Sequence, residues 1–181
     1  MTKNKIVLLL FTIVAAIQLS VPLNMVWQWE DIRQTGQQYQ WLTTPVDPYD
    51  ALRGRYVDLG FKAAQGPLAS GEKLSNGQTV YATLGVDANG YAYISTVSAN
   101  KPETGDYVKA RALYLSGGMM HVVLPFNRYY MREDLAPAAE IAYRKSAGKD
   151  GRVIVRIKNG MGVVEQLYIG EKTIEERINS Y

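Results

Sequence analysis

The sequence contains no cysteine, and this absence removes several classes of site at once. A disulfide framework, a cysteine-based zinc site and a thiol nucleophile are all excluded. So is a bacterial lipoprotein anchor, because that lipid is attached to a cysteine just after the apolar leader. Cysteine-free chains occur in both oxidising and reducing compartments, so this absence does not place the protein in either one.

The sequence also lacks any block of like charge. It has 20 Lys and Arg against 17 Asp and Glu, a formal net charge of +3. Two of the basic residues, Lys3 and Lys5, precede the first apolar run and leave 18 basic against 17 acidic residues in the remainder. A nucleic-acid partner needs a clustered basic face, so this balance predicts no nucleic-acid binding.

Histidine is almost absent, since His121 is the only one, and any serine–histidine pair would have to use it. Its place in the alternating stretch MMHVV predicts a strand residue on one face of a sheet rather than a catalytic base. A metal site would have to use carboxylates, and Asp47 and Asp50 form the nearest cluster. Beside Pro48 these residues are first of all turn formers, so we expect no metal and no cofactor.

One long apolar run is present near the N-terminus. Residues 6–27, IVLLLFTIVAAIQLSVPLNMVW, carry no charge and match the roughly 20 residues that a helix needs to cross a bilayer. Two lysines precede the run and two acidic residues follow it. The positive-inside rule then predicts that residues 1–5 lie in the cytoplasm and that the rest of the chain lies outside.

A cleaved signal peptide is the alternative to this uncleaved signal anchor. The apolar core from Ile6 to Ile17 has a suitable length for a signal peptide. However, the candidate cleavage site ending at Ser20 has Gln18 at a position that should be small. We therefore favour an anchor that stays attached and contacts the bilayer through residues 6–27.

Beyond the span, the pattern changes from helix to strands and turns. Residues 28–38 predict a short juxtamembrane helix that Gly36 would stop. Residues 39–181 predict a β-rich domain with about eight strands, because apolar residues alternate between turn signals. The clearest turns are Asp87 to Gly90 and Asn159-Gly160.

Only one stretch of this domain has helical periodicity, the segment REDLAPAAEIAYRKSAG, followed much later by a short amphipathic tail. Short turns join neighbouring strands in antiparallel fashion. The predicted fold is therefore mainly β, an antiparallel barrel or sandwich with one short helix, preceded by an N-terminal transmembrane helix.

Two enzymatic interpretations conflict with the sequence. Ser70 and Lys73 form an S-x-x-K pattern of the kind used by penicillin-binding enzymes, with Ser98 and Lys172 in the later motif positions. Yet Ser70 lies among glycines with no helix behind it, which that catalytic arrangement needs. A membrane-anchored Ser/Lys protease needs a serine close to the span, and none occurs between Asn24 and Ala69.

Tyrosine-rich strands offer a binding surface. Tyr91 and Tyr93 share one face of a predicted strand, which suits a groove for a sugar or peptide but is equally explained by strand propensity. Arg128, Tyr129 and Tyr130 form a second candidate surface after Pro-Phe.

The stretch DPYDALRGRYVDLGF, residues 47–61, resembles the signature of the bacterial membrane-anchored family named for its GDYXXLXY motif. Arg55 stands where the motif has Asp, and Phe61 stands where it has Tyr. A literal Gly-Asp-Tyr at residues 105–107 lacks the Leu and Tyr that should follow it. The residues assigned to the signature are Asp47, Pro48, Asp50, Arg53, Gly54, Arg55, Tyr56, Leu59 and Phe61.

The preceding span, Arg128-Tyr129-Tyr130 and the closing stretch 151–169 also resemble this family, so the resemblance covers most of the chain. The family has no characterised function, and its members often lie beside, or are fused to, multi-pass membrane proteins. The resemblance implies an accessory or assembly role and supplies no catalytic residue. The replacement of the motif Asp by Arg55 suggests that the signature is architectural.

From these observations we expect a non-enzymatic, extracytoplasmic domain that docks on a membrane protein partner, multi-pass partners included, or on itself as a homo-oligomer. One alternative is an envelope hydrolase, acting as a peptidase or on peptidoglycan. Another is a small-ligand or glycan-binding module. The expected location is the bacterial inner membrane, with a cytoplasmic N-terminus and a periplasmic C-terminal domain.

Overall fold

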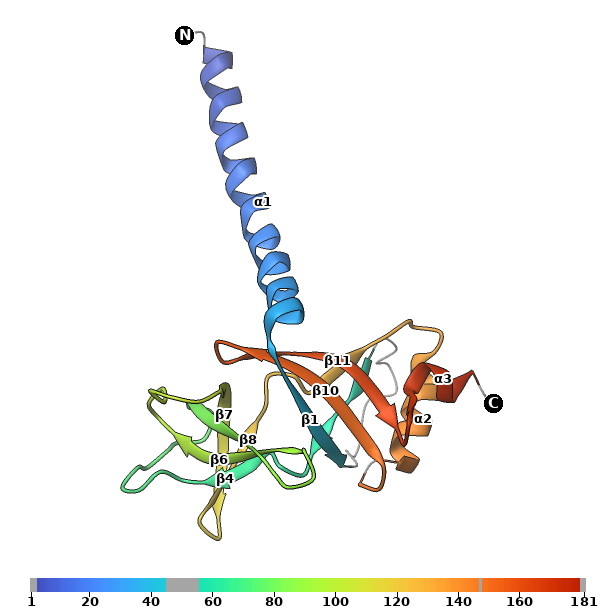
Figure 1. Ribbon diagram of the computed structural model, residues 1–181. Coiled ribbons are helices and arrows are strands. Elements are labelled where there is room, and N and C mark those ends of the chain that lie inside the picture. Colours follow the sequence, from blue (N-terminus) through green and yellow to red (C-terminus); the bar gives the residue numbers. More distant parts are fainter. Residues whose placement is uncertain (1–2, 45–55, 147, 180–181) are drawn as a thin grey trace.

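The computed structural model describes residues 3–44, 56–146 and 148–179 and shows a long helix projecting from a β-rich domain (Figure 1). Helix α1, Lys3–Thr35, has 33 residues, which corresponds to about 50 Å at the usual rise per residue. None of its apolar part is buried in the domain, and the helix is long and apolar enough to cross a membrane. The predicted span and the predicted juxtamembrane helix are therefore parts of a single helix.

The helix ends at Thr35 rather than at residue 38, and β1 begins at Gln37, so the predicted end was three residues too late. Gly36 is the only residue between the two elements, as its helix-stopping chemistry suggested.

Strands in the described residues form two five-stranded sheets and one two-stranded sheet. The first sheet has the order β12-β11-β10-β1-β3, and its strands are Lys172–Thr173, Met161–Ile169, Gly151–Lys158, Gln37–Thr44 and Gly60–Phe61. The second has the order β4-β8-β7-β5-β6, and its strands are Gln65–Pro67, Met119–Val123, Tyr107–Ser116, Thr79–Val86 and Ala92–Ser98. The third sheet pairs β2, Tyr56–Asp58, with β9, Arg128–Tyr130.

All pairings between named strands are antiparallel, and single bridges such as Gln40 to Tyr91 and Val108 to Gly160 join the two larger sheets. The result is a nearly closed, barrel-like β structure, which confirms the predicted mainly β fold. The prediction of about eight strands missed the shortest ones, because a strand of two or three residues is too short to show alternation.

Two short helices cover the first sheet on the right of Figure 1. Helix α2, Ala136–Ser146, lies within the segment whose periodicity predicted a helix. Helix α3, Ile174–Ile178, begins with a capping box in which Thr173 and Glu176 satisfy each other's backbone N–H groups.

A single hydrophobic core joins the sheets and centres on three aromatic rings. Trp41 packs against Phe61 and Phe126 with ring centroids 5.7 and 5.6 Å apart, and these two Phe rings contact each other as well. The core therefore holds together strands that lie far apart in the sequence.

The hairpin turn of β10 and β11 has positive φ at both Asn159 and Gly160, as the predicted turn requires.

Candidate functional site

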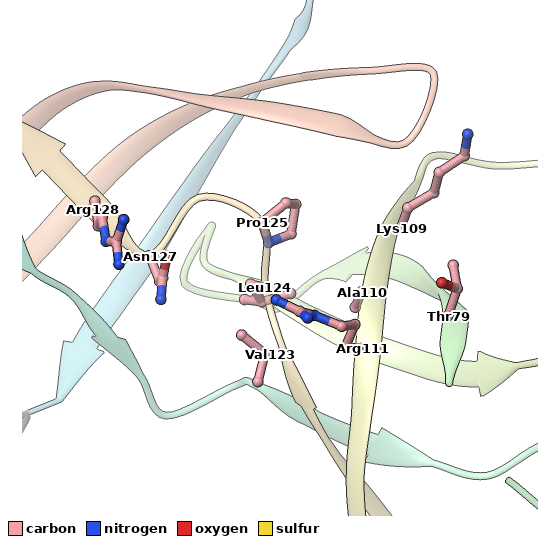
Figure 2. Close-up of a pocket in the computed structure, with 9 residues that line it drawn as sticks. All are labelled: Thr79, Lys109, Ala110, Arg111, Val123, Leu124, Pro125, Asn127 and Arg128. Carbon is pink, nitrogen blue, oxygen red and sulfur yellow. The ribbon is translucent and has the colours of Figure 1, made fainter. Parts of the chain in front are cut away.

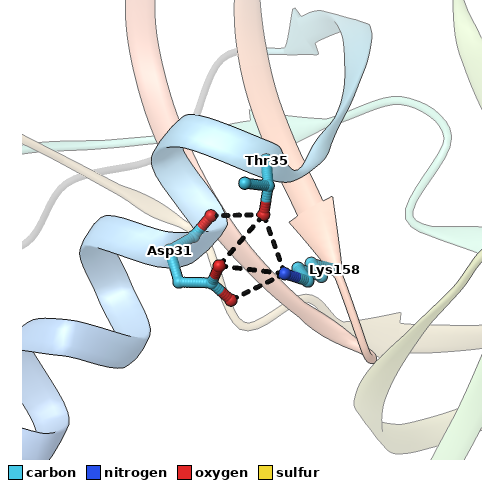
Figure 3. A network of polar contacts seen from close by, with 3 residues as sticks. All are labelled: Asp31, Thr35 and Lys158. Carbon is cyan, nitrogen blue, oxygen red and sulfur yellow. Dashed lines mark hydrogen bonds and ion pairs between the residues drawn. The ribbon is translucent and has the colours of Figure 1, made fainter.

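A polar network fixes the end of helix α1 to the β domain (Figure 3). The ammonium of Lys158, at the end of β10, donates to both carboxylate oxygens of Asp31, at 2.7 and 3.0 Å. It also donates to the hydroxyl of Thr35 at 2.8 Å, and that hydroxyl donates to the backbone oxygen of Asp31. The hydrogen bond from Lys158 lowers the pKa of Asp31 below its ordinary value, so this carboxylate stays ionised near neutral pH.

Packing reinforces the network at the same junction. Ile32 is only 2% exposed, although the rest of the helix before it projects from the domain. A methyl group on Gly36 would collide with the carbonyl oxygen of Ile32 and would lie 3.1 Å from the backbone nitrogen of Ile157. Arg156 donates to the Gly36 carbonyl and forms an ion pair with Glu165 at 2.7 Å. We call this contact between α1 and strands β10 and β11 the helix–domain junction.

The junction contains no flexible linker, since a continuous helix passes into β1 through one residue. Helix α1 packs against both β10 and β11. The direction of the helix axis is therefore fixed relative to the domain, and the orientation of the domain follows from that of the helix.

The signature strand and the Arg128-Tyr129-Tyr130 surface lie side by side in the structure. Strand β2 carries Tyr56 of the signature, and it pairs with β9, which is the Arg128-Tyr129-Tyr130 stretch. Tyr56 lies opposite Tyr130, with ring centroids 5.6 Å apart, and the Arg128 guanidinium lies 4.8 Å from the centre of the Tyr56 ring. Arg128 also faces Asp58 at 3.8 Å.

The alternation of the signature predicts that Val57, Leu59 and Phe61 face the core and that Tyr56 faces the other way, and the described part takes this orientation. Val57, Leu59 and Phe61 are buried, at 0%, 4% and 8% exposure, while Tyr56 lies on the other side of the strand. The remaining signature residues lie outside the described residues; they are Asp47, Pro48, Asp50, Arg53, Gly54 and Arg55. Their assigned role stays a prediction.

The middle residue of the second surface points into the domain. Tyr129 is 8% exposed, and its hydroxyl donates to Glu175 at 2.7 Å. Gln166 donates to the hydroxyl of Tyr129 and to the other carboxylate oxygen of Glu175, so the three side chains form a closed network. Burial and the neighbouring Glu175 raise the pKa of Tyr129 above its ordinary value, and Tyr129 stays neutral.

A groove of about 580 Å³ connects these residues to helix α1, and we call it the junction groove. Trp29 and Tyr130 are its most exposed aromatic residues, at 46% and 67%. Its lining comes from α1, the segment before and including β9, and β11; the residues are Trp29, Pro125, Phe126, Asn127, Arg128, Tyr129, Tyr130, Gly162, Val163, Val164 and Glu165. The groove thus lies directly beside the end of the apolar span.

The other candidate residues from the sequence are not gathered into a catalytic cluster. His121 lies on β8 and stacks on Tyr114, with ring centroids 4.3 Å apart. Ser98, at the end of β6 in the second sheet, donates a hydrogen bond to Glu72, which is next to Lys73 in the sequence. Lys172 lies in β12 of the first sheet. Among the described residues, no three histidine or acidic side chains are placed to hold a metal ion.

Sequence patterns did not reveal the residues that build the junction. Lys158 reaches Asp31 across 127 positions of sequence, and Ile32 looks like any other apolar residue of the long helix. The only local signal was Gly36, which marked the change from helix to strand.

In a comparison with protein families, residues 18–167 match the family described as GDYXXLXY protein. The matched region extends from the middle of the apolar run to β11, and it includes the whole junction groove. Comparison with curated proteins and with solved structures gives no match.

Proposed function

This chain belongs to the GDYXXLXY protein family, and we propose that it is a membrane-anchored accessory domain that docks on a membrane protein partner or on a second copy of itself. In this proposal residues 6–27 span the bacterial inner membrane, the N-terminus is cytoplasmic and the β domain is periplasmic. The observation that carries the proposal is the helix–domain junction, because it holds a groove in a defined position at the end of the span.

The position of the groove follows from the length of the helix. Trp29 lies two residues beyond the apolar run, which is about 3 Å along the helix axis. Tryptophan near the end of a span favours the headgroup layer of a bilayer. The junction groove then lies at the membrane surface, where an extracytoplasmic part of a neighbouring membrane protein can reach it.

The span itself carries a feature that favours association within the bilayer. Gln18 lies near the middle of residues 6–27, and no hydrogen bond to its side chain is found within the part of the chain described here. In contrast, Thr12 and Ser20 donate to backbone carbonyls of their own helix, and Asn24 accepts from Gln28. A side-chain amide in hydrocarbon gains from a hydrogen bond to another helix, by about 0.6–2 kcal/mol.

Small and polar residues lie close to one another along the span. Ala16, Ser20 and Asn24 follow one another at four-residue spacing and so share one side of the helix. Such spacing lets a second helix approach closely. The span and the groove together therefore support a partner that has both a transmembrane helix and an extracytoplasmic part.

Co-purification of the full-length tagged chain in mild detergent tests the proposal. We expect a second membrane protein in fixed proportion, or a dimer of this chain, to elute with it. Gln18→Leu and Tyr130→Ser should each reduce the amount of partner recovered. Their controls are Val21→Leu in the same span and Tyr114→Ser, which removes a tyrosine of similar exposure outside the groove.

Elution of the wild-type chain alone as a monomer would remove the support for docking. Equal recovery of partner with Tyr130→Ser and with wild type would place the contact elsewhere than in the junction groove.

A further inference from the structure

A second cavity, of about 510 Å³, lies between strand β7 and the segment that leads from β8 to β9 (Figure 2). Figure 2 shows Arg111 extending from β7 toward that segment, from which Asn127 and Arg128 project, while the side chain of Lys109 extends from β7 in another direction. We call this cavity the basic cleft. Its lining residues are Thr79, Lys109, Ala110, Arg111, Val123, Leu124, Pro125, Asn127 and Arg128.

The strand pattern explains why cations gather in the basic cleft. Val108, Ala110 and Ala112 of β7 are buried, so the alternate residues Lys109 and Arg111 must share the outer face. Arg111 pairs with Thr79 on one neighbouring strand and with Val123 on the other. Neither neighbour offers a carboxylate to the guanidinium.

Arg111 differs from the other arginines in the described residues. Each of the others has an ion pair or another side-chain interaction, as in Arg33–Glu30, Arg144–Glu140 and Arg156–Glu165. No such partner is found for Arg111 or for Lys109 among the described residues, and the described lining of the cleft contains no acidic residue. Arg128 is only partly neutralised, because Asp58 lies 3.8 Å away.

We propose that the basic cleft binds a phosphate-bearing ligand. The polar side chains of the cleft can all donate hydrogen bonds: two guanidinium groups, one ammonium, one amide and one hydroxyl. A phosphate presents several acceptor oxygens and up to two negative charges on one compact group, and arginine binds it through two parallel hydrogen bonds.

Two kinds of compound present such a phosphate: a lipid phosphodiester with one negative charge, or a soluble phosphate with more than one. The basic cleft shares Pro125, Asn127 and Arg128 with the junction groove, which reaches Trp29 at the end of the span. The headgroup of an anionic phospholipid is therefore one source, and a soluble phosphorylated compound is the other. This site goes beyond the proposed docking function, because it needs no protein partner.

The test uses the full chain reconstituted in phosphatidylcholine nanodiscs, with pyrophosphate as the soluble probe and isothermal titration calorimetry as the readout. Arg111→Gln removes the unpaired guanidinium, and Lys109→Gln is a second variant on the same strand face. Arg144→Gln is the control, since it removes the same charge from an exposed arginine of α2 outside the cleft. Thermal unfolding of each variant checks that the domain remains folded.

A second arm addresses the lipid source. The chain is reconstituted in discs that contain both phosphatidylcholine and phosphatidylglycerol, then extracted, and the retained phosphatidylglycerol is measured by mass spectrometry for wild type and for each variant. Retention that depends on Arg111 identifies the lipid headgroup as the ligand, whereas pyrophosphate binding without such retention identifies a soluble ligand.

We expect saturable binding in one of the two arms, weakened at least about tenfold by Arg111→Gln and changed less than about twofold by Arg144→Gln. The proposal is overturned if wild type binds neither pyrophosphate nor phosphatidylglycerol. It is equally overturned if Arg111→Gln and Lys109→Gln both bind as wild type does. Loss of a protein partner in the co-purification experiment would leave this result unaffected, so the two proposals can fail separately.

Discussion

Truncation of Ile32 to alanine should release the β domain from the helix that carries it. The side chain is 2% exposed and is the one buried residue of α1 in the described structure. Replacement by alanine removes about three carbon groups, worth about 2.4 kcal/mol at the usual value per buried group, and a residual cavity can raise the cost to about 5 kcal/mol. Even the lower figure weakens the packing of helix α1 on the β domain by about 50-fold.

Distance measurements by pulsed electron paramagnetic resonance can detect this release. Because the chain has no cysteine, spin labels can be attached at Leu23→Cys in the span and at Arg144→Cys on α2 without removing any native thiol. We expect one narrow distance distribution for the otherwise wild-type chain and a broad distribution for Ile32→Ala. Val26→Ala, at an exposed position of the same helix, is the control and should keep the narrow distribution.

Two results would refute this reasoning. A broad distribution in the labelled wild-type background would mean that the helix–domain junction does not fix the orientation. A narrow distribution in Ile32→Ala, combined with lower thermal stability, would mean that Ile32 stabilises the domain without holding the helix in place.

Three further predictions concern the stability of the core and the dependence of that stability on pH. Gly162→Ala should lower the free energy of unfolding by about 1–3 kcal/mol in thermal denaturation, because the added methyl group collides with the Phe126 ring. Phe61→Ala should cost about 3–5 kcal/mol in the same assay and so show the structural role of this signature position; an unchanged melting temperature would contradict it. The raised pKa of Tyr129, caused by burial and by Glu175, means that the folded chain keeps this proton when the unfolded chain has lost it. Stability should therefore fall as the pH rises above the ordinary tyrosine pKa of 10.0, and urea denaturation should show a shallower fall for Tyr129→Phe.

Local patterns in the sequence predicted the features that depend on local chemistry. The apolar run predicted the exposed part of α1, and the turn at Asn159-Gly160 predicted the β10–β11 hairpin. Alternation also predicted the buried side of the signature strand, as Val57 and Leu59 show. Each of these signals lies within a few residues of sequence, where side-chain period and turn conformation decide the structure.

Contacts between distant segments could not be predicted in the same way. The pairing of β2 with β9 brings Tyr56 to Tyr130, although neither three-residue strand has a period of its own. The basic cleft likewise combines Arg111 with Arg128 from separate elements. Nothing in a single sequence states which strands become neighbours. Tyr56 and Arg128 were therefore recognisable as candidates without their arrangement, and Arg111 was not singled out at all.

Photo-crosslinking in intact membranes tests the central claim most directly, namely that the junction groove faces a membrane protein partner. Tyr130→p-benzoylphenylalanine places the reactive group in the groove, and Tyr114→p-benzoylphenylalanine places it at a similarly exposed position outside the groove. We predict a discrete crosslinked product with a membrane protein, or with a second copy of this chain, from position 130 and none from position 114. A product from position 114 alone, or no product from either position, would contradict the account.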